Sequence, residues 1–283
     1  MASLTAILMT LNEEQNVGEC IRRLGSLPER ICVVDSGSTD GTRDIARGLG
    51  AEVVEHPFVD YASQFNWALE HLDIATEWVL RIDADEFYTP ELCAELEAAM
   101  AEHARDDVNG FITCSDFCFM GRQLRHGGDK RRKIVAFRRG HGFMEPRRMD
   151  EHTLLKDGRA AELHSRFEHH DHKDLTRWIA KLNLYASREA DDYFADRERY
   201  RKGEVDLSGI ADEALIATRR RKFLFYYRLP KFLRCWMLFL YDYLLRGGFL
   251  DGKEGFVYHF MYARWYRTLV DAKILEREKG GGA

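Results

Sequence analysis

The first half of the chain alternates between short apolar runs and longer stretches in which apolar residues recur at helical spacing. The four runs of strand length lie at residues 4–9, 31–35, 51–55 and 78–83. The helical patterns between them lie at residues 13–24, 42–49 and 61–72. Because this rhythm is typical of strands that alternate with crossover helices, we predict an α/β fold with a mostly parallel sheet flanked by helices.

The alternation ends after residue 105. Strand-like runs at 110–116 and 133–138 flank a loop rich in glycine and basic residues, and from Asp174 onward the spacing of apolar residues is helical. We therefore expect three parts, residues 1–105, 106–173 and a mainly helical region at 174–279. The closing residues 280–283 are predicted to be a flexible tail.

Composition narrows the class of protein. The 283 residues are 45% hydrophobic and 31% charged, as in an ordinary folded protein. A formal net charge of -5 argues against a general nucleic-acid binder, which normally carries a basic surplus. The first residues lack the basic start of a signal peptide, and no uncharged stretch of about 18 residues is present. We expect a cytoplasmic protein with reduced cysteines and no membrane-spanning helix.

Polar clusters follow three of the predicted strands. They lie at residues 10–13, 35–38 and 83–86. In an open α/β sheet, ligands bind beyond the carboxyl ends of the strands, where such loops gather. The three clusters are therefore expected to meet in space and to form one site.

The cluster at the end of the fourth run contains Asp83-Ala84-Asp85. Two carboxylates at a strand end suit a hard cation such as Mg²⁺ or Mn²⁺, and such an ion commonly binds substrate phosphates. We interpret Asp83 and Asp85 as candidate ligands of a divalent cation that would in turn bind a diphosphate. A solvated turn that leads into the next helix is the alternative.

The cluster after the second run reads Asp35-Ser36-Gly37-Ser38 and leads into a helix capped by Thr39 or Asp40. An acidic side chain can accept a hydrogen bond from a nucleobase, and small residues allow the backbone to approach a nucleotide. The same residues are also favoured in any strand–turn–helix connection. The first cluster, from Thr10 to Glu13, is expected to begin a helix with Asn12 as its cap.

Taken in order, Thr-Leu-Asn-Glu, Val-Asp-Ser-Gly-Ser-Thr-Asp-Gly-Thr and Arg-Ile-Asp-Ala-Asp-Glu resemble glycosyltransferase family 2, the inverting transferases with the GT-A fold. The resemblance covers roughly residues 4–92 and implies that residues 1–105 form the nucleotide-sugar-binding half of a GT-A domain. Residues 106–173 would then form its acceptor and catalytic part.

The resemblance also implies roles for individual residues. Asp35 would contact the nucleotide base, Asp83 would approach the ribose and the sugar, and Asp85 would ligate a divalent cation, Mg²⁺ or Mn²⁺. The other residues expected to line the donor pocket are Thr10, Leu11, Glu13, Ser36, Gly37, Gln64, Asn66 and Ala84.

Two further groups are expected to complete the chemistry. An inverting transfer needs a base for the acceptor hydroxyl, and the resemblance places it at Asp150 or Glu151, with Asp150 favoured and an exposed acidic helix start as the alternative. Lys130 and Arg131 in the basic loop could offset charge on the leaving diphosphate, could lie in a solvated loop, or could bind an anionic acceptor. A downstream histidine could complete the metal shell; the candidates are His164, His169, His170 and His172.

Segments of the second half, such as Tyr227-Arg228-Leu229-Pro230, resemble bacterial lipopolysaccharide-core glucosyltransferases. This implies transfer of glucose from UDP-glucose to a lipid-linked glycan, with a β-linkage, at the cytoplasmic face of the inner membrane. Residues 219–246 interleave basic and aromatic side chains, as in a peripheral membrane contact, although a core helix with a basic outer face is equally compatible. Transfer to a polyprenyl phosphate is the alternative activity, and a non-catalytic nucleotide-binding or membrane scaffold is the alternative class.

Overall fold

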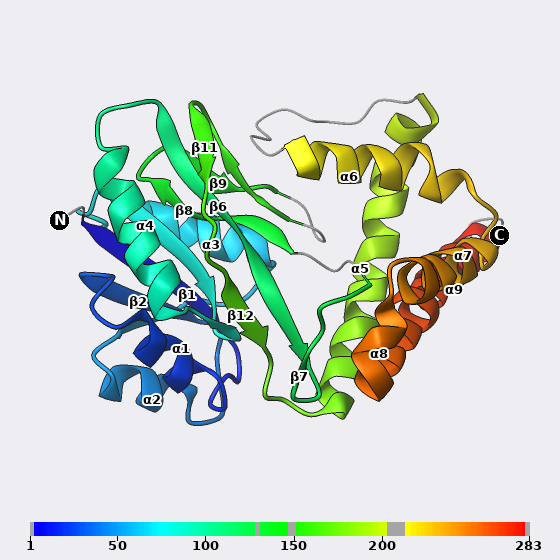
Figure 1. Cartoon of the computed structure of the whole chain (residues 1–283), viewed down its shortest axis with the longest axis horizontal. Helices are drawn as coiled ribbons and strands as arrows, with labels where there is room; N and C mark the ends of the chain where they lie inside the picture. The colour runs from blue at the N-terminus through cyan, green and yellow to red at the C-terminus, as the bar shows by residue number, and fades with distance from the viewer. Residues whose placement is uncertain (1–2, 128–130, 147–150, 203–212, 281–283) are drawn as a thin grey trace. The chain divides into compact units, whose positions relative to one another are not determined.

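The computed structural model describes residues 3–127, 131–146, 151–202 and 213–280. The chain forms two compact units, which are treated separately below (Figure 1). The sheet unit contains the described residues of 3–116, 131–146 and 151–172, and the helical unit contains those of 117–127 and 173–280. The predicted subdivision of the sheet unit at residue 105 stays a prediction.

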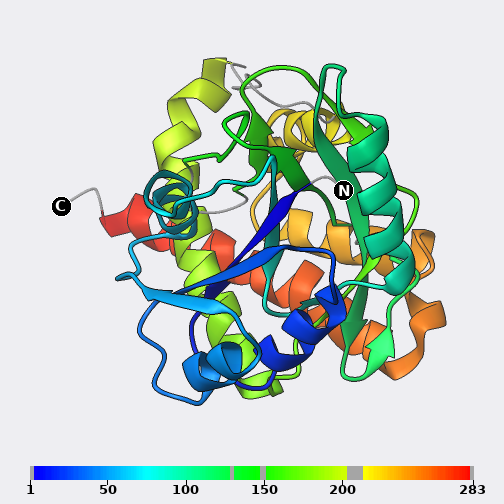
Figure 2. The same ribbon diagram turned by 90° about the vertical axis from the view of Figure 1, so that its left-hand side faces the viewer.

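The sheet unit is built on the four predicted strands. They are β1 (Leu4–Thr10), β2 (Arg30–Asp35), β3 (Glu52–Glu55) and β4 (Trp78–Asp83). They lie side by side in the parallel order β3-β2-β1-β4 (Figure 2). The sheet then continues with β8 (Arg132–Arg138), antiparallel to β4, and with β6 (Val108–Phe119), antiparallel to β8. The predicted α/β class is confirmed, and the sheet is mixed: its parallel strands β3-β2-β1-β4 continue into the antiparallel strands β8 and β6.

Shorter strands and four helices complete this unit. The strands are β5 (Glu86–Phe87), β9 (Gly142–Met144), β10 (Thr153–Leu155), β11 (Arg159–Glu162) and β12 (Phe167–His170). The helices are α1 (Val17–Leu24), α2 (Thr42–Gly48), α3 (Tyr61–His71) and α4 (Pro90–Glu102). The pairings β5–β12 and β9–β10 are antiparallel, and β11 lies parallel to β6.

Successive residues of β1 point to opposite faces of the sheet and build two apolar layers. Leu4, Ala6 and Leu8 pack in one layer with side chains of α1 and α4. Ile7 points to the other layer and packs with side chains of α3. Because both faces are covered by helices, these strands are almost wholly apolar, which is why their sequence is so easily recognised.

The structure corrects the predicted start of the first helix. Helix α1 begins at Val17, four residues later than expected, and Asn12 does not cap it. Asn12 instead adopts a left-handed backbone conformation with φ of 56°. Its side-chain oxygen accepts a hydrogen bond of 2.8 Å from the Thr39 amide. The local pattern typical of an N-cap therefore serves a contact between two loops.

The helical unit contains five α-helices with shorter helical turns between them in its described part. The α-helices are α5 (Leu175–Lys202), α6 (Glu213–Leu224), α7 (Leu233–Leu240), α8 (Gly252–His259) and α9 (Arg267–Gly280). The turns are η1 (Tyr226–Arg228), η2 (Tyr241–Leu245), η3 (Gly248–Asp251) and η4 (Phe260–Tyr266). The end of β6, at Cys118 and Phe119, pairs in this unit with β7 (Arg122–Gln123). The predicted helical C-terminal region is confirmed, although α9 includes Gly280 of the expected tail.

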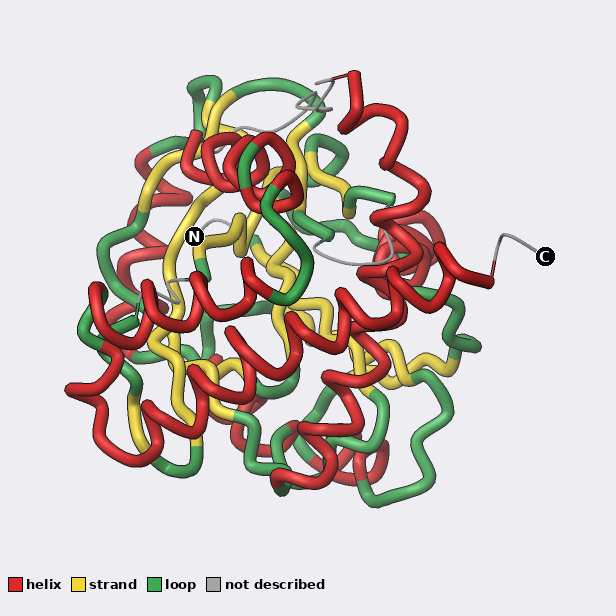
Figure 3. The backbone as a smooth tube through the Cα atoms, turned by 90° about the vertical axis from the view of Figure 1, so that its right-hand side faces the viewer, coloured by secondary structure: helices red, strands yellow, loops and turns green. Residues whose placement is uncertain are grey.

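Two features hold the helical unit together. Leu182 and Ala186 of α5 pack with Val270 and Ile274 of α9 in an apolar core, and Figure 3 draws the helices of this unit in red.

In the described ranges of the chain, no helix has both the length and the apolar character needed to cross a bilayer.

A buried ion pair joins α7 to α9. The Arg234 guanidinium and the Asp271 carboxylate are 2% and 1% exposed. Asp271 also accepts a hydrogen bond of 2.8 Å from the amide of Phe232, which has a positive φ of 65°. Asp271 therefore holds the strained turn that starts α7 as well as the buried cation.

We predict that Asp271→Ala lowers the free energy of unfolding by about 3–5 kcal/mol, because it leaves the Arg234 cation buried without its counter-ion. The matched control is Asp191→Ala, which removes a half-exposed partner of Arg277 between α5 and α9 and should cost at most about 1 kcal/mol. Urea unfolding followed by circular dichroism measures both. Equal losses for the two variants would contradict the assignment of Asp271 as a central support.

Candidate active site

The carboxyl ends of β1, β2 and β4 bring the three predicted polar clusters together. Thr10 lies beside Asp35 in the register of β1 and β2, and Met9 lies beside Asp83 in the register of β1 and β4. The loops that follow these strands therefore start from neighbouring positions at one edge of the sheet. The convergence that the sequence predicted is present in the structure.

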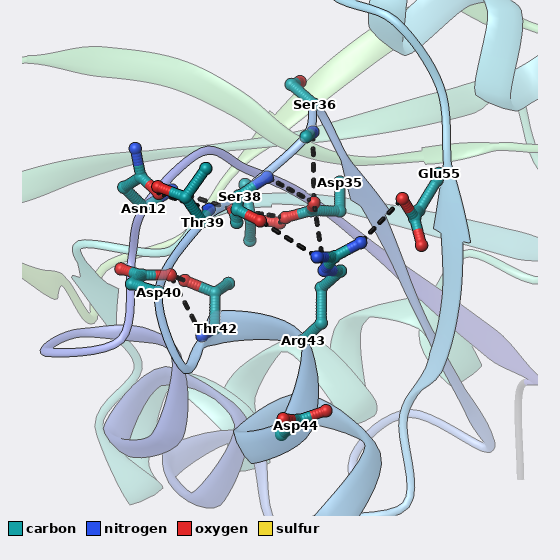
Figure 4. Close-up of polar contacts among 12 residues, drawn as sticks. Asn12, Asp35, Ser36, Ser38, Thr39, Asp40, Thr42, Arg43, Asp44 and Glu55 are labelled. Atoms are coloured by element: carbon teal, nitrogen blue, oxygen red, sulfur yellow. Dashed lines mark hydrogen bonds and ion pairs between the residues drawn. The ribbon is translucent and has the colours of Figure 1, made fainter.

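The loop after β2 is organised around the buried carboxylate of Asp35 (Figure 4). The amides of Gly37 and Ser38 donate to its Oδ1 at 3.1 and 2.8 Å. The hydroxyls of Thr10 and Ser38 donate to its Oδ2 at 2.8 and 2.5 Å. The Arg43 guanidinium lies 3.8 Å from Oδ1. Asp35 thus ties together the ends of β1 and β2 and the start of the turn.

This geometry bears on the role expected for Asp35. Its side chain is fully buried and already accepts four hydrogen bonds from the protein, so in this state the carboxylate shapes the pocket wall. Direct contact with a nucleobase stays a prediction. Gly37 and Leu11 are exposed, with Leu11 47% exposed, and Ser36 is partly exposed.

The two polar residues predicted on α3 hold neighbouring elements. Gln64 is buried and donates to the Ser36 hydroxyl at 3.1 Å, and its side-chain oxygen lies 2.7 Å from Nδ1 of His56. Asn66 donates to the carbonyl of Met144 and accepts from its amide, both at 2.8 Å. Gln64 therefore borders the Asp35 loop, whereas the Asn66 amide is engaged with strand β9. Their predicted contacts with the nucleotide remain untested.

Glu13 lies at the start of the segment that leads to α1. Its amide donates to the Thr42 hydroxyl at 2.7 Å, and its carboxylate accepts from the Asn16 side chain at 2.9 Å. Glu13 thus links the loop after β1 to the start of α2. Its contact with a nucleotide stays a prediction.

Asp83, at the end of β4, lies in a cluster of cations and a phenol that the sequence did not reveal. Its Oδ1 accepts a hydrogen bond from the Tyr61 hydroxyl, and its Oδ2 lies 3.3 Å from Arg81 and 3.6 Å from the Lys133 ammonium. Burial alone would raise the pKa of Asp83, but the charges of Arg81 and Lys133 hold it below its ordinary value. Asp83 is therefore an ionised, firmly oriented carboxylate.

Glu86 is a second acidic residue of this cluster; it lies in the predicted polar cluster at 83–86, but no role was predicted for it. Both of its carboxylate oxygens lie 2.5 Å from Nζ of Lys133, and one accepts from the Asp83 amide at 3.1 Å. Burial and the neighbouring Asp83 raise the pKa of Glu86 despite the Lys133 charge. Lys133 comes from β8, 47 residues further along the chain, so local sequence patterns could not reveal this pair.

The Asp85 carboxylate lies beside the ring of His169. Strand β12 pairs with β5 so that His169 lies opposite Glu86, and this places Nε2 of His169 3.2 Å from Oδ2 of Asp85. Arg131 lies 3.2 Å from the other ring nitrogen, Nδ1. The ring of His169 thus lies beside the side chain of a predicted metal ligand, whereas His170 reaches Asp85 through its backbone amide. Arg131 contacts the same His169 ring.

The donor set at this point suits a divalent cation that also binds a diphosphate. Among the described residues no group of three or more acidic, histidine or cysteine side chains is arranged around a common point. Mg²⁺ and Mn²⁺ commonly take only one or two protein ligands and complete their shell with water and phosphate oxygens. Asp85 and His169 would supply two such ligands, whereas Asp83 is engaged by Tyr61, Arg81 and Lys133.

Two predicted site residues, Asp150 and Lys130, lie outside the described residues. Glu151, the alternative base, is partly exposed and lies two residues before β10. Ala84 is buried between the two aspartates. The roles of Asp150, Glu151 and Lys130 stay predictions.

Comparison with known proteins adds the family. The model of glycosyl transferase family 2 matches residues 5–173, which include every strand end described above. The chain belongs to glycosyl transferase family 2. The family and the enzyme class predicted from the three motifs are thereby confirmed, and the matched region covers the loops that carry Asp35, Asp83, Asp85 and His169.

Relatives within the family include proteins of two bacterial genera. An uncharacterized glycosyltransferase from Rickettsia conorii is 41% identical over 103 residues, which are 36% of this chain and 36% of that protein. The chain thus aligns with only about a third of the length of the Rickettsia relatives. The lipopolysaccharide core biosynthesis glycosyltransferase LpsC of Rhizobium meliloti is 27% identical over 97% of this chain and 92% of its own length.

Among solved structures, glucosyl-3-phosphoglycerate synthase from Mycobacterium tuberculosis, bound to Mn²⁺, UDP and glucosyl-3-phosphoglycerate, is similar to this chain with a TM-score of 0.34 and 22% identity. The similarity covers 41% of this chain and 44% of that one.

The loop next to Asp35 generates a pH-dependent prediction. Partial burial would raise the pKa of Asp40, but hydrogen bonds from the Thr42 hydroxyl and amide and from the Glu14 amide hold it below its ordinary value. A carboxyl group with a lowered folded-state pKa stabilises the protein at neutral pH, and this contribution is lost as the pH falls through that pKa. Asp40→Asn should therefore lower the free energy of unfolding at pH 7, and the difference from wild type should shrink below about pH 4.

The control is Asp44→Asn, four residues further along the chain, where the side chain is 90% exposed. This change should alter the free energy of unfolding by no more than about 0.5 kcal/mol. Denaturant unfolding measured across the pH range tests both variants. A constant difference between wild type and Asp40→Asn at all pH values would contradict the assignment.

Proposed function

We propose that this chain is an inverting hexosyltransferase that moves glucose from UDP-glucose to a lipid-linked glycan and forms a β-linkage. The observation that carries the proposal is the pairing of Asp85 with His169 at the end of β4, next to the firmly held carboxylate of Asp83. Membership of glycosyl transferase family 2 supports the reaction class. UDP and glucose follow from the resemblance stated above.

The reaction is a direct displacement at the anomeric carbon of the donor sugar. A carboxylate, Asp150 or Glu151, takes the proton of the acceptor hydroxyl as its oxygen forms the new bond to the anomeric carbon. The bond from that carbon to the diphosphate oxygen breaks on the opposite side, and the nucleoside diphosphate leaves. An α-linked donor therefore yields a β-linked product.

The residues around β4 would bind and orient the donor. Asp83 would accept hydrogen bonds from the ribose or the sugar hydroxyls, and its contacts with Arg81, Tyr61 and Lys133 fix the orientation of its carboxylate. A divalent cation held by Asp85 and His169 would neutralise charge on the diphosphate. A site that supplies one imidazole and one carboxylate should bind Mn²⁺ in preference to Mg²⁺, because imidazole is a softer ligand than carboxylate.

The acceptor is proposed from similarity along the second half of the chain. LpsC, which aligns with 97% of this chain, is described as an enzyme of lipopolysaccharide core biosynthesis. A lipopolysaccharide-core or related lipid-linked glycan is the corresponding acceptor here. Such an acceptor would place the enzyme at the cytoplasmic face of the inner membrane, as a peripheral protein that binds through residues 219–246.

The metal assignment predicts a specific pattern of UDP binding. Mn²⁺ should strengthen binding of UDP to the wild type, and both Asp85→Ala and His169→Ala should remove most of this gain, by about tenfold or more. His164→Ala is the control, because the His164 side chain is exposed and its backbone amide is the group bound by Glu95. Isothermal titration with and without Mn²⁺ measures each case. Unchanged Mn²⁺ dependence in the His169→Ala variant would remove His169 from the metal shell.

The base assignment predicts that one of two variants loses turnover while it still binds donor. Asp150→Asn is expected to bind UDP-glucose normally and to lower kcat by about 10²–10⁴-fold, since it cannot accept the acceptor proton. Glu151→Gln should then keep most of the activity. The reverse pattern would assign the base to Glu151, and full activity in both variants would refute the proposal for this acidic pair.

A further inference from the structure

Helix α7 has an inverted distribution of polar and apolar side chains. From α7 into η2, residues 233, 236, 237, 240, 241, 244 and 245 are exposed and all are apolar or aromatic. Their spacing of three and four residues places them along one stripe of a helix. The opposite stripe is buried and carries the Arg234 guanidinium. A helix that hides its cation and exposes its apolar stripe is not explained by folding in water alone.

Aromatic contacts continue this stripe onto the next helical segments. The ring of Phe239 in α7 lies 6.5 Å from that of Phe256 and 6.0 Å from that of Phe260. Tyr243 of η2 lies 6.3 Å from Phe249. Phe249, Phe256 and Phe260 are exposed. The stripe and these three phenylalanines are called the apolar face below.

The apolar face holds most of the large exposed hydrophobic residues in the described part of the chain. Ten of the 19 such side chains there belong to this face, and Leu245 is 79% exposed. Isolated exposed hydrophobic residues are common in soluble proteins, but a contiguous group marks a binding surface.

The exposed charged residues of the segment 225–260, which contains this face, are all basic. Between residues 225 and 260, Arg228, Arg246 and Lys253 are the exposed charged residues. The Arg264 guanidinium also lies 4.1 Å from the ring centre of Trp236. Cations beside tryptophan and tyrosine are typical of segments that lie at the boundary between lipid headgroups and acyl chains.

Each of the three acidic residues of the same segment lies beside an arginine or a histidine of the helical unit. Asp242 pairs with Arg246 at 3.5 Å, Asp251 lies 2.9 Å from Nδ1 of His126, and Glu254 lies 3.5 Å from Arg122. The segment 225–260 nevertheless contains five basic and three acidic residues, a formal net charge of +2. Its exposed charged residues Arg228, Arg246 and Lys253 are called the basic rim below.

We propose that the apolar face inserts into the interfacial layer of an anionic phospholipid membrane, with α7 parallel to its surface. The basic rim selects the lipid surface over a second copy of the chain, because a symmetric self-interface would bring this rim against itself. The inference rests on the proposed function, because membrane binding would bring the enzyme to its lipid-linked acceptor. It also moves the contact predicted at residues 219–246 toward the C-terminus, as far as Phe260.

The test is flotation of the full-length chain with vesicles of phosphatidylcholine and phosphatidylglycerol, and with phosphatidylcholine alone. The wild type should float with the anionic vesicles. Leu245→Glu should lower the partition coefficient by about tenfold or more, because it puts a charge where the proposal inserts an apolar group into the lipid. The matched control is Leu184→Glu on α5, where the leucine is 50% exposed and lies off this face; it should float like the wild type.

Two further measurements separate the contribution of the basic residues from that of the inserted apolar side chains. Arg246→Glu with Lys253→Glu should weaken binding to the anionic vesicles. Brominated lipids should quench the fluorescence of the wild type, and the quenching should be largely absent in Trp236→Phe, a mild change that keeps the fold. Equal quenching in the two proteins would overturn the placement of α7 in the lipid layer.

The outcomes also separate this inference from the proposed function. UDP titration should give wild-type affinity for Leu245→Glu, which shows that the variant is folded. A wild type that floats but does not bind UDP would support the membrane face and refute the proposed donor. A wild type that binds UDP but does not float would overturn the membrane face alone. A dimer in light scattering that Leu245→Glu dissociates, together with no flotation, would assign the face to a second copy and overturn the proposal.

Discussion

The candidate site depends on matching buried carboxylates with hydrogen-bond donors at the ends of parallel strands. A carboxylate removed from water is costly unless donors or cations replace the lost solvent. Asp35 obtains its donors from two strands and its own turn, whereas Asp83 obtains them from α3, β4 and β8. The two solutions differ because the first uses neutral donors and the second uses cations. The first builds a rigid turn, and the second builds a charged surface suited to a polar ligand.

The cationic cluster explains how neighbouring acids can serve different purposes. Asp83, Asp85 and Glu86 are within four residues, and their mutual repulsion would be severe if they shared one environment. Lys133 separates Glu86 from Asp83, and His169 faces Asp85. One acid is thereby kept as an oriented acceptor, one faces a candidate ligand, and one is bound to an internal lysine. Division of roles among adjacent carboxylates requires residues from β8 and β12.

The elements that the sequence predicted well are those whose cause is local. Strands β1 to β4 are covered on both faces, so each appears as an apolar run, and their order along the chain indicates a parallel sheet. The predicted start of α1 was wrong because the Asn12 side chain accepts a hydrogen bond from Thr39, 27 residues away, and does not cap the helix. The roles of Lys133, Glu86 and Tyr61 were not predicted for a similar reason: the contacts that define them join segments far apart in the chain. The register of β5 with β12, which selects His169 among four histidines, cannot be derived from spacing.

Asn66 shows a different way in which one side chain can act as backbone. Its amide donates to the carbonyl of Met144 and accepts from the amide of the same residue, which is the pattern that a neighbouring strand would offer. Strand β9 pairs with β10 along its ladder, and Met144 would otherwise present hydrogen-bonding groups to any extended peptide that approached. Asn66 thus closes this position to strand addition. Helix α3 thereby protects the small β9–β10 sheet from edge-to-edge association with other chains.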